Sequence, residues 1–277
     1  AANPSFTTHT ISSSVDGAMS VYATDLDSDG DIDIVAAAQE EDKIYWFESD
    51  GAADPSFSAT TITSSADGIY SVYAKDLDND GDMDIMSASA NDDKIAWYEN
   101  NGAGDPSFTA RTIATTADGA ASVFAADLDG DGDQDTMSAS LNDNTVAWYE
   151  NGLAAFGDPS FSSANITTSF DAAAQILTVD IDNDGDLDVL GAAYADDEIA
   201  WFENDGASDP SFTANTITTS ADGAFSVYAA DIDSDGDMDV LSASISDDKI
   251  AWYENDGATD PSFTARTITT VSYTHLR

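Results

Sequence analysis

The feature that most constrains this chain is an internal repeat. An Asp-x-Asp-x-Asp-Gly-Asp-x-Asp segment begins at five positions that lie 51, 51, 53 and 51 residues apart. A tryptophan follows each start by 21 residues. Repeats of this length are typical of propellers and solenoids, in which neighbouring copies of one unit share a continuous core. The segments begin at Asp25, Asp76, Asp127, Asp180 and Asp231, and the tryptophans are Trp46, Trp97, Trp148, Trp201 and Trp252.

Each repeat has the pattern of four short β-strands. In the first copy, these are the segments around residues 20–27, 32–38, 43–48 and 58–65, which are rich in Val, Ile, Thr, Tyr and Trp. Asn, Asp, Gly and Pro lie between them and provide turns. The fourth segment is rich in Ser and Thr, which is typical of a half-solvated edge strand. No sustained helical periodicity is present.

The third strand predicts how the repeats pack. Ile44 and Trp46 point to one side of the sheet, whereas Tyr45 and Phe47 point to the other. Both faces are therefore apolar and both must be covered. We expect an all-β fold, a β-propeller of four-stranded antiparallel blades with five repeats, in which each blade packs between two others. A linear β-solenoid, or a fragment of a longer array, is the alternative.

The predicted domain organisation is one propeller spanning residues 1–270. The fourth-strand pattern occurs once more near the N-terminus, so residues 3–11 are predicted to form an additional strand. Residues 271–277 resemble no other copy and are predicted to be a non-repeat tail. The five repeats span approximately residues 15–65, 66–116, 117–168, 169–220 and 221–270.

The charge of the chain excludes several functions. It has 54 acidic and 7 basic residues among 277, for a formal net charge of −47. Nucleic-acid binding is not expected, because phosphate neutralisation needs Lys and Arg. Anionic membrane surfaces should repel the chain, and no apolar run is long enough for a transmembrane helix. Hydrophobic residues make up 42% of the sequence, which is enough for a folded core.

The aspartate segment has the composition of a calcium loop. Ca²⁺ takes about six to eight oxygen ligands, and alternate carboxylates at Asp25, Asp27 and Asp29 can turn inward. Gly30 permits the sharp turn, position 7 offers its backbone carbonyl, and Asp33 completes the shell. The segment is not an EF-hand, because position 12 is Ala36 rather than Glu and the flanks are strands.

The loop between two strands, followed by a WYEN-type segment, resembles the FG-GAP/VCBS repeat, which is related to the calcium-binding blades of integrin α-subunits. The resemblance covers roughly residues 3–270. It implies a β-propeller with about five Ca²⁺ ions per chain, each held by side chains at positions 1, 3, 5 and 9 and by the position-7 carbonyl. The implied ligand residues are Asp25, Asp27, Asp29, Asp31 and Asp33; Asp76, Asp78, Asp80, Asp82 and Asp84; Asp127, Asp129, Asp131, Asp133 and Asp135; Asp180, Asp182, Asp184, Asp186 and Asp188; and Asp231, Asp233, Asp235, Asp237 and Asp239.

The predicted function is a non-catalytic calcium-binding scaffold or an adhesion and recognition module, extracellular or on the cell surface. No enzyme is expected, because the repeats contain no histidine and no cluster of Lys and Arg that would serve as base and charge stabiliser. Two alternatives remain open: a filament subunit that self-associates through its spare terminal strand, and a carbohydrate-binding or polysaccharide-lyase-like propeller. A protein or a polysaccharide is the candidate partner beyond calcium.

Overall fold

The computed structural model describes residues 7–152 and 159–270, and within them the regular structure is almost entirely β. Twenty strands form five four-stranded antiparallel sheets, each built from four consecutive strands in sequence order. The five repeats of four-stranded antiparallel sheets predicted from the sequence are therefore confirmed. The strands are β1 (Ala18–Thr24), β2 (Asp33–Ala38), β3 (Lys43–Ser49) and β4 (Phe57–Thr63); β5 (Ile69–Lys75), β6 (Asp84–Ser89), β7 (Lys94–Asn100) and β8 (Phe108–Ala114); β9 (Ala120–Ala126), β10 (Asp135–Ser140), β11 (Thr145–Asn151) and β12 (Phe161–Thr167); β13 (Ala173–Val179), β14 (Asp188–Ala193), β15 (Glu198–Asn204) and β16 (Phe212–Thr218); and β17 (Ala224–Ala230), β18 (Asp239–Ser244), β19 (Lys249–Asn255) and β20 (Phe263–Thr270).

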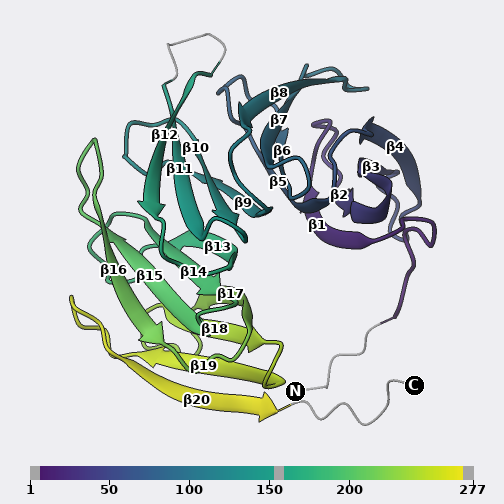
Figure 1. The fold of residues 1–277 in the computed structure, drawn as a ribbon. Coiled ribbons are helices and arrows are strands. Elements are labelled where there is room, and N and C mark those ends of the chain that lie inside the picture. The colour runs from purple at the N-terminus through teal and green to yellow at the C-terminus, as the bar shows by residue number, and fades with distance from the viewer. Residues whose placement is uncertain (1–6, 153–158, 271–277) are drawn as a thin grey trace.

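The sheets follow one another along an open arc (Figure 1). The first strand of each sheet lies on the inside of the arc and the fourth strand on the outside, as β1 and β4 show for the first sheet (Figure 1). Residues from all five inner strands line one open cavity of about 700 Å³. The described part of the chain contains no helix that is long and apolar enough to cross a bilayer. Whether the arc is a propeller stays a prediction.

Neighbouring sheets pack through two different apolar faces. We call the face that carries the tryptophan the tryptophan face, and the other the opposite face. Between the first and second sheets, Leu26, Ile44 and Trp46 of one tryptophan face are buried with Val72 and Tyr98 of the next opposite face. The same combination recurs at the other three junctions. Four similar interfaces therefore hold the five sheets together.

A buried asparagine amide crosses each junction between sheets. At the third of them, Asn204 Nδ2 donates a hydrogen bond of 2.8 Å to the backbone oxygen of Leu128 in the preceding sheet. The first sheet has Ser49 at this position. Because a buried carbonyl needs a donor, the amide fixes the position of each sheet against the previous one. The equivalent pairs are Asn100 with Leu26 at 2.9 Å, Asn151 with Leu77 at 2.9 Å, and Asn255 with Ile181 at 3.0 Å.

A second hydrogen bond links the inner strands. Ser20 Oγ accepts from the backbone N–H of Val72, and its equivalents Ser71 and Ser122 do the same toward the next sheet. In the fourth sheet, Gln175 Oε1 replaces the hydroxyl and accepts from Val227 N at 2.8 Å. The sequence change at residue 175 therefore preserves this contact with a longer side chain.

The structure differs from the predicted organisation in one described segment, which lies near the N-terminus. Residues 7–11 form no strand, and residues 3–6 of the strand expected at 3–11 lie outside the described residues. The predicted tail at 271–277 also lies outside them. The first sheet contains the short 3-10 helix η1 (Gln39–Glu41), between β2 and β3.

Candidate metal centres

Each aspartate loop joins the first strand of a sheet to the second. In the first sheet, β1 ends at Thr24 opposite Asp33 at the start of β2, so the loop closes a hairpin between them. Two residues of the loop have left-handed backbone conformations: Ser28 with φ of 60° and Gly30 with φ of 98°. A side chain is disfavoured at the second of these values, which explains the glycine at position 6 of every loop.

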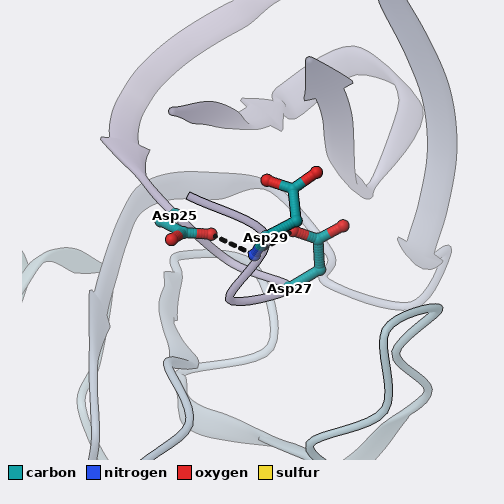
Figure 2. Close-up of side chains that lie close together, drawn as sticks. All are labelled: Asp25, Asp27 and Asp29. Atoms are coloured by element: carbon teal, nitrogen blue, oxygen red, sulfur yellow. Dashed lines mark hydrogen bonds between the residues drawn. The ribbon is translucent and has the colours of Figure 1, made fainter. Parts of the chain in front are cut away.

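The loops bring three carboxylates together in each sheet. In the first loop these belong to Asp25, Asp27 and Asp29, and one oxygen from each lies within 4.8 Å of the other two (Figure 2). Positions 1 and 3 belong to the group in every loop. The third member is position 5 in the first and third loops and position 9 in the others. The remaining groups are Asp76, Asp78 and Asp84; Asp127, Asp129 and Asp131; Asp180, Asp182 and Asp188; and Asp231, Asp233 and Asp239.

Backbone N–H groups orient these carboxylates. Asp25 accepts from Asp29 N at 3.1 Å with Oδ1 and from Gly30 N at 3.0 Å with Oδ2. Asp29 in turn accepts from Asp31 N at 2.9 Å. Figure 2 shows the first of these bonds as a dashed line. Such short-range bonds are typical of aspartate in turns, and here they hold three like charges close to each other.

The position-9 aspartate is an anchor of the sheet as well as a candidate ligand. Asp84 is fully buried, and its Oδ2 accepts from Leu77 N at 3.1 Å while its Oδ1 accepts from Asn100 N at 2.8 Å. It thereby ties the loop to the end of the third strand. The equivalents Asp33, Asp135, Asp188 and Asp239 make the same two bonds.

The position-7 side chain does not join the carboxylate group of its loop, and in four of the loops it packs against a glycine. A Cβ added at Gly51 would lie 1.9 Å from Oδ2 of Asp31, so this carboxylate packs directly over the glycine that follows the third strand. The pairs Asp82 with Gly102, Asp186 with Gly206 and Asp237 with Gly257 have the same arrangement. No position-7 carboxylate belongs to the groups found among the described residues. This placement is compatible with a ligand role for the position-7 backbone carbonyl.

The electrostatics of the loops favour a cation. Burial raises the pKa of Asp84, Asp135 and Asp188 to about 7. At position 3, burial and then the neighbouring Asp80 raise the pKa of Asp78 to about 6. These directions describe carboxylates without a counter-ion, because clustered and desolvated negative charges favour protonation.

Among the position-1 aspartates of the described loops, two carboxylate oxygens have no hydrogen-bond partner. Oδ1 of Asp127 and Oδ1 of Asp180, both at position 1, are buried without a hydrogen bond. A buried carboxylate oxygen is normally paired with a donor or a metal. A donor set made only of carboxylate and carbonyl oxygens suits hard cations such as Ca²⁺ and Mg²⁺. The residues therefore fit a bound divalent cation, and five groups of aspartates are available to hold one.

Comparison with known families finds the FG-GAP-like repeat. Its model matches residues 25–87, 76–138, 127–191 and 180–242, which together span residues 25–242. Each match runs from one aspartate loop to the second strand of the next sheet. The comparison with curated proteins returned no match.

Solved structures with a similar fold come from several kinds of protein. A lectin of Agrocybe aegerita that recognises non-reducing terminal N-acetylglucosamine has a TM-score of 0.60 and 19% identity, over 90% of this chain and 65% of its own. The V. cholerae biofilm matrix protein Bap1 has a TM-score of 0.51 and 18% identity, over 90% and 38% of the two chains. The exotype rhamnogalacturonan lyase YesX has a TM-score of 0.55 and 13% identity, over 88% of this chain and 48% of its own. This chain spans less than two thirds of each, and the likeness concerns the fold.

Proposed function

The chain belongs to the FG-GAP-like repeat family, and we propose that it is a non-catalytic calcium-binding scaffold or recognition module with a β-propeller arrangement. In this proposal each aspartate loop holds one Ca²⁺. Positions 1, 3, 5 and 9 contribute carboxylate oxygens, and position 7 contributes its backbone carbonyl. The bound ion supplies the positive charge that allows these carboxylates to ionise together.

The recurrence of the carboxylate group at the same place in all five sheets is the observation that carries the proposal. The role of calcium is structural, since each loop connects two strands and its buried position-9 aspartate also contacts the third. A ligand at about 100 times its dissociation constant adds about 2.7 kcal/mol per site. Several such sites would account for much of a typical net stability of roughly 5–15 kcal/mol.

The decisive experiment compares melting temperatures in millimolar calcium and in excess chelator, with bound calcium counted on the same sample. We expect about five ions per chain and a large fall in melting temperature on chelation. Asp78→Asn, which changes a ligand in the second loop, should remove one ion. Asp105→Asn is the matched control, because this aspartate is exposed and outside the loops. An unchanged melt with little bound metal would refute the calcium role.

An extracellular or cell-surface location is part of the proposal. Weak calcium sites on a structural protein need a calcium-rich compartment, and the net charge of −47 is reduced most effectively by divalent ions. The partner is proposed to be a protein or a polysaccharide bound at the rim. Localising a tagged chain in its host tests the location, since retention in the cytosol would contradict it.

Carbohydrate binding is the second candidate function. It is supported by the fold likeness to the N-acetylglucosamine-binding lectin and by the open cavity along the inner strands, which Tyr22, Tyr73 and Phe124 line together with serine side chains. Aromatic faces and hydroxyls are the groups that commonly contact sugars. Binding to a glycan array in the presence of calcium would favour this function, whereas the absence of any signal would leave the scaffold role.

A further inference from the structure

Two sheets hold a lysine ammonium group in the same small receptor. In the fifth sheet, Lys249 Nζ lies 2.6 Å from a carboxylate oxygen of Asp247 and donates to the backbone oxygen of Ser220 at 2.7 Å. The two charged side chains are 20% and 26% exposed, so the ammonium is largely removed from water. A primary ammonium has three donors, and here a carboxylate and a carbonyl accept from it. The equivalent groups of the second sheet are Lys94, Asp92 and Ser65.

The third sheet keeps the acceptors of this receptor but has no lysine. Thr145 stands at the position of Lys94 and Lys249. The carboxylate is retained as Asp143, and the backbone oxygen of Thr116 stands at the position of the accepting carbonyl. Asp143 Oδ1 accepts from Thr145 N at 3.2 Å. In the described part of the chain, no lysine or arginine forms an ion pair with Asp143, so this carboxylate has no counter-charge there.

A pocket of about 190 Å³ lies beside Asp143 and Thr145, at the place that lysine fills in the other two sheets. Ser140 also lines the pocket; it is 1% exposed, and its Oγ has no hydrogen-bond partner. Its equivalents Ser89 and Ser244 are likewise unpaired in the two sheets that have lysine. In the third sheet, however, the pocket leaves space for a donor next to the hydroxyl. Because buried polar groups are normally paired, this hydroxyl favours a polar ligand.

The pocket also has polar groups that the second sheet lacks. Ser163 and Asn165, two exposed residues of β12, line it. The second sheet has Ala110 and Thr112 at the equivalent positions of β8. The buried ring of Tyr149 forms part of the wall. The pocket thus combines an apolar wall, which suits an alkyl stem, with several oxygen acceptors, which suit an ammonium group.

We propose that this pocket binds a primary alkylammonium group. The ligand is a free alkylamine or the lysine side chain of another molecule, which present the same chemistry. Its ammonium donates to Asp143, to the backbone oxygen of Thr116 and to Ser140 Oγ, while its alkyl stem packs against Tyr149. The net charge of −47 raises the local concentration of such cations. None of the loop aspartates lines the pocket, so the inference is independent of the metal.

The test titrates the full chain, in saturating calcium, and follows the backbone amide signals of residues 143–145 by NMR. n-Butylammonium is the first probe, because it reproduces the lysine side chain. We expect saturable shifts at the Thr145 amide, since its N–H donates to Asp143 Oδ1. n-Butanol should bind at least about tenfold more weakly, because a hydrogen bond to a charged group is stronger. Nα-acetyl-lysine amide is the second probe: equal binding extends the site to lysine side chains of proteins, and much weaker binding restricts it to free amines.

Thr145→Lys is the matched variant, because it recreates in the third sheet the ion pair of the second. We expect its ammonium to pair with Asp143 and to weaken the binding of n-butylammonium at residues 143–145 by at least about tenfold. Lys94→Thr is the reciprocal variant and should create a second responsive site at residues 92–94. An equal response to tetramethylammonium, which has the charge but no N–H donor, would show charge screening alone and overturn the proposal. An unchanged response in Thr145→Lys, or no saturable shift in the parent protein, would overturn it as well.

Discussion

The asparagine that crosses each junction offers a sharp test of how the sheets are held together. Asn204 is 1% exposed. Its Nδ2 donates to Leu128 O at 2.8 Å in the preceding sheet and to Leu187 O at 3.1 Å in its own, and its Oδ1 accepts from Gly206 N at 3.0 Å. Asn204→Ala removes all three bonds and leaves two carbonyls and one N–H without this partner.

The expected loss follows from these three bonds. A typical intramolecular hydrogen bond contributes about 1 kcal/mol net, so the variant should lose about 3 kcal/mol of unfolding free energy. For a chain of this size, that corresponds to a fall in melting temperature of roughly 6–12 °C. Urea denaturation in saturating calcium, with the slope checked against the parent protein, measures the difference directly.

Ser49 provides the matched control. It occupies the equivalent position in the first sheet, where its hydroxyl accepts one bond of 3.3 Å from Gly51 N. Ser49→Ala should therefore lower the free energy of unfolding by less than about 1 kcal/mol. If Asn204→Ala were no more destabilising than Ser49→Ala, the amide would not join the sheets energetically, and the account of the junctions given above would be wrong.

Three further predictions concern the loops. Without calcium, the protein should become less stable as pH rises from about 4 to about 8, because burial raises the pKa of Asp84, Asp135 and Asp188 to about 7 in the folded state from an unfolded value near 3.8. The stabilisation by calcium should grow over the same range; chelator melts that show the reverse slope would contradict this reasoning. Asp84→Asn should lower the free energy of unfolding by roughly 1–3 kcal/mol even in chelator, since the amide has one accepting oxygen and its NH₂ group cannot replace the other in the bonds from Leu77 N and Asn100 N. A variant that melts like the parent in chelator would refute the anchor role. Gly257→Ala should lower the free energy of unfolding by about 1 kcal/mol or more, because φ is +66° and the new Cβ would lie 2.1 Å from Asp237 Oδ2. Gly104→Ala is the control, because nothing lies within 4 Å of the added Cβ there. Equal melting temperatures for the two variants would argue against the close approach at Gly257.

The repeat pattern predicts most of the fold because each sheet is made of consecutive strands. The alternation in the third strand, with Ile44 and Trp46 on one side, predicts that both faces are covered, and the four junctions confirm this for the second, third and fourth sheets. The strand expected at 3–11 depended on pattern alone. Residues 7–11 are not a strand, although the same pattern forms β4 and β20, because those segments pair with the third strand of their own sheet and residues 7–11 pair with none of the described strands.

The candidate loops are visible in the sequence, but the division of roles within them is not. Position 9 anchors the loop to the third strand, and this depends on the distance between Asp84 and Asn100, which lie on different strands. The contact between the position-7 carboxylate and the glycine after the third strand could have been predicted from the spacing of the two residues in the sequence. Gly51 follows Asp31 by twenty residues, and the same interval separates Asp237 from Gly257. A fixed interval between an aspartate and a glycine indicates close approach.

The sequential order of strands has a consequence for how the chain is made. Every strand pairs with a strand adjacent in the sequence, so one repeat can form its sheet soon after its last residue leaves the ribosome. The first sheet then presents its tryptophan face to the second repeat as that repeat emerges. Synthesis therefore proceeds from the first sheet toward the fifth, and each new sheet meets a surface that is already folded.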